Sequence, residues 1–324
     1  MQTILVPLDG SPHAEQILPH VRQLAPVLQA NVLLFQVVAD PEHIYTLISA
    51  KTSATADGHR SDWLRQQQRL HERQQIERYL ETQAALLRVS GIAVSCAVEI
   101  GPPAATIITV AERSQASLIA LASHGYSGLR RWAAGSVADQ VIQATPLPVL
   151  LVRISPEPPS VPASLRRILI PLDESVFASY ALDHAITVAQ GAQAELIVLQ
   201  TLAPSIEDYI GGVPALLDQR STLREHVRQA YAARWGEQRA AQATITSAIG
   251  LGGDANAIIE EARHRHVGLI VLAMPAYSAL HRRSGGRIAA QVFHNTHTPL
   301  LLVHSPACYN SAGELKKTTS VSEP

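Results

Sequence analysis

The sequence predicts an α/β protein made of two doubly wound domains, each with a five-stranded parallel sheet. Two observations lead to this fold class. Short runs of aliphatic and β-branched residues alternate with longer segments whose apolar residues have helical spacing, which is typical of strand–helix units in a parallel sheet. The whole alternation then occurs a second time, and a chain of 324 residues is long enough for two domains of about 150 residues each.

The two copies are related by three apolar runs that return in the second half. The runs and their repeats are 4–11 with 168–175, 118–122 with 269–273, and 148–153 with 299–304. The first pair is 164 residues apart and the other two pairs are 151 apart, so the first copy carries 13 additional residues. We expect this insertion between Asp40 and Arg60.

The strands expected in the first copy are short and apolar, which suits buried strands of a parallel sheet. They are 4–8, 32–38, 92–100, 118–122 and 149–153. The first helix is expected to begin after Ser11 as its N-cap, and Pro19 and Pro26 predict a kink or an early end. The other helices are expected over Ser61–Val89, Ala104–Arg113 and Val137–Gln143, the first of them with a core-facing stripe of Ile76, Leu80, Ala84 and Leu87.

A proline-rich segment joins the copies. Four prolines lie within residues 155–162, which predicts a stiff, extended linker. We therefore expect a first domain over residues 1–154, a linker over 155–164 and a second domain over 165–305. Residues 306–324 are polar and lack apolar periodicity, which predicts a disordered tail.

The composition argues against several functional classes. The formal net charge is −1, so no overall positive field attracts nucleic acid or an anionic membrane. No apolar stretch approaches the roughly 20 residues that span a bilayer, and the start of the chain lacks the features of a signal peptide. The chain has two cysteines, Cys96 in a strand-like run and Cys308 in the polar tail, and we do not expect a disulfide. We expect a cytoplasmic protein without nucleic-acid or membrane partners.

The loop after the fourth strand has the features of an anion-binding site. Ligands of doubly wound sheets bind at the carboxyl ends of the strands, where the strand order reverses. Here the loop contains Gly125, and Gly135 and Ser136 open the next helix. Glycine lets the backbone approach a ligand closely, and free N–H groups at a helix N-terminus favour phosphate.

These motifs resemble those of the universal stress protein family. The resemblance rests on Ala122-Ser-His-Gly125, nine further residues and Gly135-Ser136, with the opening run 6–11 and the closing run 148–152, and it covers both copies. It implies Rossmann-like domains of the adenine nucleotide alpha hydrolase-like type. One branch of the family binds ATP or related adenine nucleotides through G-x-x-G-(nine)-G-S/T, and the other branch lacks the motif. The implied ligand is ATP, AMP or ADP, with Mg²⁺ as the companion ion.

The resemblance also implies which residues form the site. Asp9 would contact the ribose or the adenine edge, although it can also serve only to cap the turn after the first strand. The backbone of Val37 would meet adenine, and the glycine-rich loop would hold the phosphates. The full set of implied nucleotide-binding residues is Pro7, Asp9, Val37, Ala122, His124, Gly125, Gly135, Ser136 and Val137.

Ala122 departs from the motif, which has its first glycine at this position. If the backbone there needs a positive φ, the alanine methyl costs about 1–2 kcal/mol. If φ is negative, the cost is near zero.

The second copy keeps the length of this loop but has lost most of its motif residues. Pro275 removes a backbone donor, Ala276 replaces the close-approach glycine, Arg287 replaces the hydroxyl, and Glu174 stands where the first copy has Gly10. Arg287 retains one group that can bind phosphate. These changes predict a second domain that does not bind nucleotide.

Three functions fit these observations. The first is a stress-response regulator with one adenine nucleotide site per chain and no catalysis. The second is a structural protein whose copies serve as assembly modules that pair through the closing strands 149–152 and 300–303, with a homodimer as the expected assembly. The third is a slow ATP hydrolase, but the chain has no G-x-x-x-x-G-K-[ST] loop and no evident base, so no catalytic residue is predicted.

Closely spaced histidines are candidate ligands for a metal ion. The closest pairs are His264 with His266 and His294 with His297. Neither has a nearby cysteine or a suitable carboxylate, so no metal site is predicted.

Overall fold

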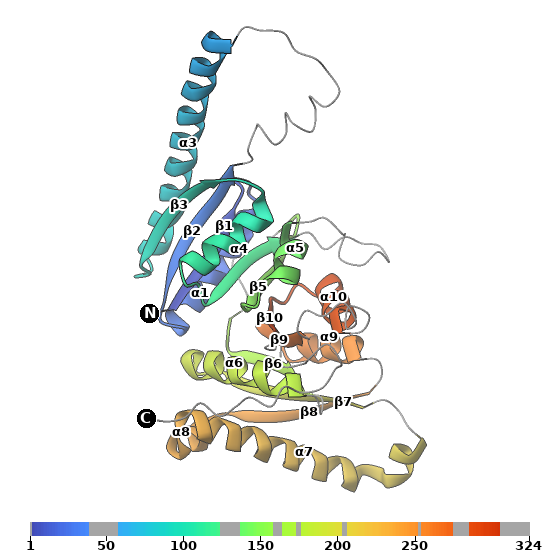
Figure 1. The fold of residues 1–324 in the computed structure, drawn as a ribbon. Helices are drawn as coiled ribbons and strands as arrows, with labels where there is room; N and C mark the ends of the chain where they lie inside the picture. The colour runs from blue at the N-terminus through green and yellow to red at the C-terminus, as the bar shows by residue number, and fades with distance from the viewer. Residues whose placement is uncertain are drawn as a thin grey trace, which may run out of the picture.

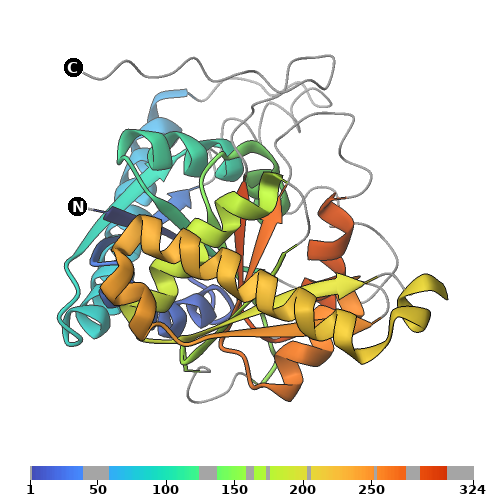
Figure 2. The same cartoon turned by 90° about the horizontal axis from the view of Figure 1, so that it is seen from below.

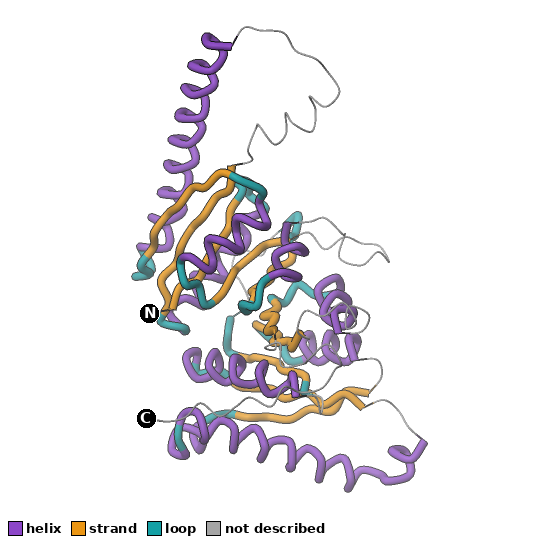
Figure 3. The backbone as a smooth tube through the Cα atoms, viewed as in Figure 1, coloured by secondary structure: helices purple, strands orange, loops and turns teal. Residues whose placement is uncertain are grey.

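The computed structural model places the ten strands of the described residues in one continuous sheet (Figures 1 and 3). The residues that it describes are 2–38, 58–123, 137–157, 164–172, 176–202, 206–251, 254–274 and 285–304. The strand order is β3-β2-β1-β4-β5-β10-β9-β6-β7-β8. Each half of the chain contributes five strands that run parallel to one another, as predicted, and the two halves meet at β5 and β10.

The first half contains strands β1 to β5 and the helices that connect them. The strands are β1 (Gln2–Leu8), β2 (Ala30–Val38), β3 (Val94–Ile100), β4 (Leu118–Ser123) and β5 (Val149–Arg153). The helices are the 3-10 helix η1 (Ala14–Ile17), α1 (Leu18–Val27), α3 (Gly58–Arg88), α4 (Pro103–Arg113) and α5 (Val137–Ala144). All five predicted strands are present within two residues of their expected bounds.

The second half repeats this order. Its strands are β6 (Arg167–Pro171), β7 (Glu195–Leu202), β8 (Ile245–Leu251), β9 (Leu269–Met274) and β10 (Leu300–His304). Its helices are α6 (Val176–Ala192), α7 (Ile206–Trp235), α8 (Glu237–Gln242), α9 (Asp254–His264) and α10 (Gly285–Asn295). Figure 2 shows the long α7 running across the outer face of this half.

The repeat is visible in the backbone as well as in the sequence. Among the described residues other than glycine, four have a positive φ, and they form two matched pairs. Gln29 and Gln193 are 164 residues apart, with φ of 50° and 51°, and Gln115 and His266 are 151 apart, with φ of 51° and 52°. The two copies therefore end equivalent helices in the same way.

The insertion lies where the sequence places it. Residues 39–57 separate β2 from α3, whereas only residues 203–205 separate β7 from α7. The inserted residues themselves lie outside the described residues. So do most of the expected linker and the whole expected tail over 306–324.

The start of α1 differs in detail from the expected helix. A 3-10 turn over Ala14–Ile17 precedes the α-helix, which begins at Leu18 and has Pro19 in its first turn. Proline is tolerated there because the N–H groups of the first turn have no partner within the helix. Pro26 lies in the last turn, so the two prolines mark the two ends of α1.

Two apolar cores cover the two faces of the sheet. Ile4, Val6 and Leu8 of β1 face one core, which includes residues of α1, α3, α6 and α7, whereas Leu5 faces the other core with residues of α4, α5, α9 and α10. This alternation follows from the two-residue period of a strand and makes both halves doubly wound. The predicted stripe of α3 contributes Leu80, Ala84 and Leu87 as buried side chains.

The two halves join through their last strands. β5 and β10 pair antiparallel, with Leu150 opposite Leu301, Leu151 opposite Leu300 and Val149 opposite Leu302. The expected pairing of copy with copy through the closing strands is therefore confirmed within one chain. A homodimer remains a prediction and has to use another surface or an exchange of halves between chains.

Two features of the described residues bear on the predicted class. No helix among them combines the length and apolar character needed to cross a membrane. Cys96 is a free, half-buried cysteine on β3, and burial raises the pKa of its thiol to about 11, with a smaller contribution from Glu81. The thiol is thus protonated at neutral pH, which makes it a poor nucleophile.

Candidate nucleotide-binding site

Three neighbouring strands bring the described part of the predicted site together. The strand order β2-β1-β4 is parallel throughout, so the carboxyl ends of these strands lie at one edge of the sheet. Pro7 lies near the end of β1, and Asp9 follows that strand directly. Val37 and Ala122 lie near the ends of β2 and β4. The structure therefore gathers four of the nine predicted residues at the reversal point of the strand order.

The turn after β1 is held by two side-chain hydrogen bonds. Asp9 Oδ1 accepts a bond from the Ser11 backbone N–H at 2.9 Å, and Ser11 Oγ accepts one from the Ala14 backbone N–H at 3.1 Å. Gly10 between them has a φ of +81°, a conformation that side-chain-bearing residues rarely adopt. Asp9 thus fixes this turn, and its side chain is exposed at the edge where the ligand is expected.

Ala122 has an extended backbone. It lies inside β4 and pairs with Val152 in the parallel ladder, and it does not belong to the described residues with positive φ. Of the two alternatives for this position, the one with negative φ therefore holds. The methyl group is half-buried against the core of the α1 side and costs almost nothing in backbone strain.

The remaining predicted residues are only partly described. Val37 is half-buried and pairs with Glu99 of β3, so its backbone is fixed in the sheet. Val137 is the first residue of α5, and 39% of it is exposed. His124, Gly125, Gly135 and Ser136 lie outside the described residues. Their roles rest on the sequence motif.

The structure adds Gln36 to the surroundings of the site. It precedes Val37 on β2 and pairs in register with Leu8. A Cβ atom at Gly10 would lie 3.8 Å from Gln36 Nε2, so the amide faces the turn that holds Asp9. Gln36 Oε1 is buried and has no hydrogen-bond partner among the described residues. A polar residue directly after the apolar run 32–35, and just before Val37, is the sequence signal for it.

Carboxylates gather at the β1 side of this edge. Burial, then the carboxylates of Glu15 and Asp9, raise the pKa of the Tyr79 phenol of α3. These three side chains therefore lie within electrostatic range of one another. Because carboxylates accept hydrogen bonds and repel phosphate, this side of the edge suits the hydroxyl groups of a sugar.

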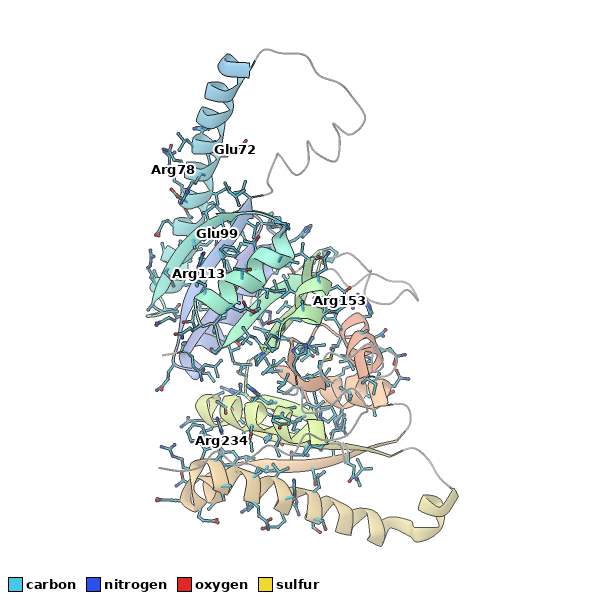
Figure 4. All side chains as sticks on the ribbon, in the orientation of Figure 1. Glu72, Arg78, Glu99, Arg113, Arg153 and Arg234 are labelled. Atoms are coloured by element: carbon cyan, nitrogen blue, oxygen red, sulfur yellow. The ribbon has the colours of Figure 1, made fainter. Side chains whose placement is uncertain are left out.

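The edge of β3 carries an exposed ion pair. Glu99 of β3 pairs with Arg113 of α4, and both labelled side chains lie on the outer part of the first half (Figure 4). Exposed pairs of this kind add little to stability. It is a surface feature of the fold and no part of the predicted site.

The equivalent edge of the second half is described only in its strands. Pro171 ends β6 and Ala273 lies in β9, at the positions of Pro7 and Ala122. Residues 173–175 and 275–284, which carry most of the changes from the motif, lie outside the described residues. The loss of the loop in this half therefore stays a prediction from the sequence.

Among the residues that the structure describes, no group of three or more His, Cys, Asp or Glu side chains is arranged to hold a metal ion. This set includes both members of each histidine pair considered above.

Comparison with known proteins places the chain in a family. The model of the universal stress protein family matches residues 1–153 and again residues 164–304. A universal stress protein of Methanocaldococcus jannaschii is 31% identical over 156 residues, which is 46% of this chain and 81% of that protein. The universal stress protein YxiE of Bacillus subtilis is 29% identical over 150 residues, which is 46% of this chain and 97% of that protein.

A solved structure matches almost the whole chain. The crystal structure of a universal stress protein from Archaeoglobus fulgidus covers 93% of this chain and 98% of its own, with a TM-score of 0.65 and 18% identity. At that identity the match supports the fold alone. Because the family model matches most of the chain in two consecutive segments, this protein belongs to the universal stress protein family and carries two of its domains in tandem.

Proposed function

We propose that this protein binds ATP or a related adenine nucleotide at the carboxyl edge of its first half and acts as a stress-response regulator rather than as a catalyst. The observation that carries the proposal is the meeting of Asp9, Val37 and Ala122 at one edge of the sheet, directly before the glycine-containing loop. The extended backbone at Ala122 supports it, because the one departure from the motif then carries no conformational penalty.

The proposed orientation of the ligand follows from charge. The ribose lies toward Asp9, where hydroxyl groups can donate to carboxylate oxygen. Adenine lies against the backbone of Val37. The phosphates lie on Gly125, Gly135, Ser136 and Val137, where the N-terminus of α5 offers free N–H groups. Mg²⁺ would accompany the phosphates, and we propose no protein ligand for it.

A second candidate function is structural. The pairing of β5 with β10 supports a role of the halves as assembly modules for each other. This role is compatible with the first, since the second half lacks most of the motif residues in its loop while keeping its strands. We propose that the second half serves assembly and that the protein acts in the cytoplasm, where its free Cys96 stays reduced.

Alanine at Asp9 is expected to weaken ATP binding by about tenfold. The substitution removes one charge-assisted hydrogen bond to the ribose and loosens the turn that Asp9 caps. Isothermal titration calorimetry with MgATP, after removal of any nucleotide that copurifies, measures the change. The repeat offers a matched control, because Asp173→Ala makes the same change in the half that is not expected to bind.

Equal affinities for the wild type and Asp9→Ala would contradict the assignment of Asp9. A loss of ATP affinity caused by Asp173→Ala would indicate that the site lies in the second half. Absence of binding at millimolar ATP in the wild type would contradict the proposal of nucleotide binding and favour the purely structural function.

A further inference from the structure

The joint between the halves has an approximate two-fold axis. Leu150 of β5 pairs with Leu301 of β10, and these two residues are themselves equivalent in the repeat. Both face the core on the side of α1 and α6. On that face α1 of the first half contacts α6 of the second half, so two equivalent helices meet near the axis.

Equivalent positions on these two helices carry different residues. Val27 ends α1, and the residue 164 positions later, near the end of α6, is Gly191. The matched left-handed residues Gln29 and Gln193 fix this correspondence. Val27 and Gly191 also contact each other, so the contact joins one position of the repeat to its own counterpart.

The contact is too close for any side chain on the second half. A Cβ atom at Gly191 would lie 2.4 Å from the backbone oxygen of Val27 and 2.9 Å from its Cγ1. Neither distance is compatible with van der Waals radii, and a backbone oxygen within a helix cannot move aside as a flexible side chain can. The backbone of α6 therefore approaches α1 at a place where only glycine fits.

We infer that this joint is selective: the first half accepts the second half and rejects a second copy of itself. If two first halves paired in the same geometry, Val27 would stand where Gly191 stands, with its Cβ atom 2.4 Å from the opposing carbonyl oxygen. Gly191 is thus the residue that determines the specificity of the joint. The inference is independent of nucleotide binding.

The polar contacts at the joint also differ, because equivalent positions in the two halves carry different side chains. Arg153, at the end of β5, reaches across to the second half, and its Nη1 donates to the backbone oxygen of His294 at 2.5 Å (Figure 4). At the equivalent position on β10, His304 Nδ1 lies 3.2 Å from the backbone oxygen of Leu147. A pair of identical halves would have two arginines or two histidines in these places. The joint is therefore built from two different surfaces.

This selectivity gives the second half a function of its own. Its β10 covers the edge of β5, which would otherwise present unpaired backbone groups to other chains. A second half whose loop lacks the motif residues but which keeps Gly191 still closes the first half. We infer that it is retained as a built-in partner that prevents first halves of different chains from joining.

Two substitutions in the full-length chain test the inference. Gly191→Ala is expected to lower the Tm by about 5 °C, because its methyl group meets the Val27 carbonyl, and Gly191→Val is expected to lower it further. Helix propensity alone predicts the opposite sign, since alanine in place of a helical glycine raises the Tm by about 2 °C. Hydrogen exchange of the amides at 149–151 and 300–302 should become at least about tenfold faster in both variants.

The mass of Gly191→Val in solution, from light scattering, tests the selectivity. In this variant every possible pairing of halves opposes valine to valine, so we expect no dimer with protected β5 amides. An unchanged or raised Tm for Gly191→Ala, with unchanged exchange at the joint, would overturn the inference. A Gly191→Val dimer whose β5 amides are protected would overturn it as well, because halves that oppose valine to valine would then pair stably in this geometry.

Discussion

Valine in place of Gly135 is expected to lower the affinity for ATP by at least about a hundredfold. In the motif this glycine opens the helix whose N-terminus faces the phosphates, so a branched side chain there keeps the phosphate away from the backbone N–H groups. Loss of two charge-assisted hydrogen bonds, at about 1.5 kcal/mol each, corresponds to about 3 kcal/mol and hence to this factor.

The second half again supplies the matched control for this prediction. Gly286 occupies the equivalent position 151 residues later, and Gly286→Val should leave the affinity unchanged. Calorimetric titration of both variants with MgATP, together with circular dichroism to verify that each remains folded, gives the comparison. Equal affinities of Gly135→Val and the wild type would exclude the loop as the phosphate site.

The stability of the fold should decrease markedly between pH 6.5 and pH 4, and His20 should account for much of this decrease. Burial on α1 lowers the pKa of His20 to about 4, whereas an unfolded histidine has a pKa of about 6.5. Between these values the unfolded chain binds a proton that the folded chain does not. The stability that neutral His20 permits is therefore fully present above pH 6.5 and is lost as the pH falls toward 4, to a total of about 3 kcal/mol.

Other histidines act in the same direction. His184 is the counterpart of His20 in the second half, and desolvation lowers its pKa in the same direction, but its side chain is exposed and the effect is smaller than for His20. Burial also lowers the pKa of His304 at the joint, against a smaller opposing effect of its hydrogen bond to Leu147. Acid should therefore destabilise both halves and the joint between them.

The His20→Gln variant measures how much of the acid-induced loss in stability is due to His20. Urea unfolding at pH 7.5 and pH 4.5 gives the loss in free energy of unfolding between the two conditions. We expect this loss to be about 2.5 kcal/mol smaller in His20→Gln than in the wild type. His71→Gln, which changes an exposed histidine on α3, is the control. The same loss in all three proteins would show that His20 is not held neutral by burial.

Much of the fold follows from local patterns in the sequence. The bounds of β5 agree with the prediction because Pro148 ends the preceding turn and the apolar run ends at Arg153. The end of α3 was predictable because its buried stripe stops at Leu87 and Gly91 follows with a φ of +76°. Such signals involve neighbouring residues only, so no knowledge of the tertiary structure is needed.

Features that depend on distant segments were not predictable. The requirement for glycine at Gly191 comes from the carbonyl group of Val27, which lies in the other half of the chain. The position of the Gln36 amide beside the turn depends on the register of Gln36 with Leu8 and on the conformation of Gly10. A local sequence pattern does not determine the distance between two packed helices or the register of two paired strands.

The candidate site was predictable to a different degree. The strand ends and the loop motif located it, because the carboxyl edge of a doubly wound sheet is fixed by topology. The motif alone did not fix the conformation at Ala122, because surrounding structure can impose a positive φ on alanine at a cost of about 1–2 kcal/mol, but the strand predicted over 118–122 favours a negative φ. The pairing of Ala122 with Val152 in the sheet fixes the extended backbone there.

The stoichiometry of ATP binding to the full-length chain distinguishes one competent site from two sites or none. We expect one ATP per chain of two domains, with binding abolished by Gly135→Val and retained in Gly286→Val. Two equivalent sites per chain, or no heat of binding at millimolar MgATP with a fully folded protein, would contradict it.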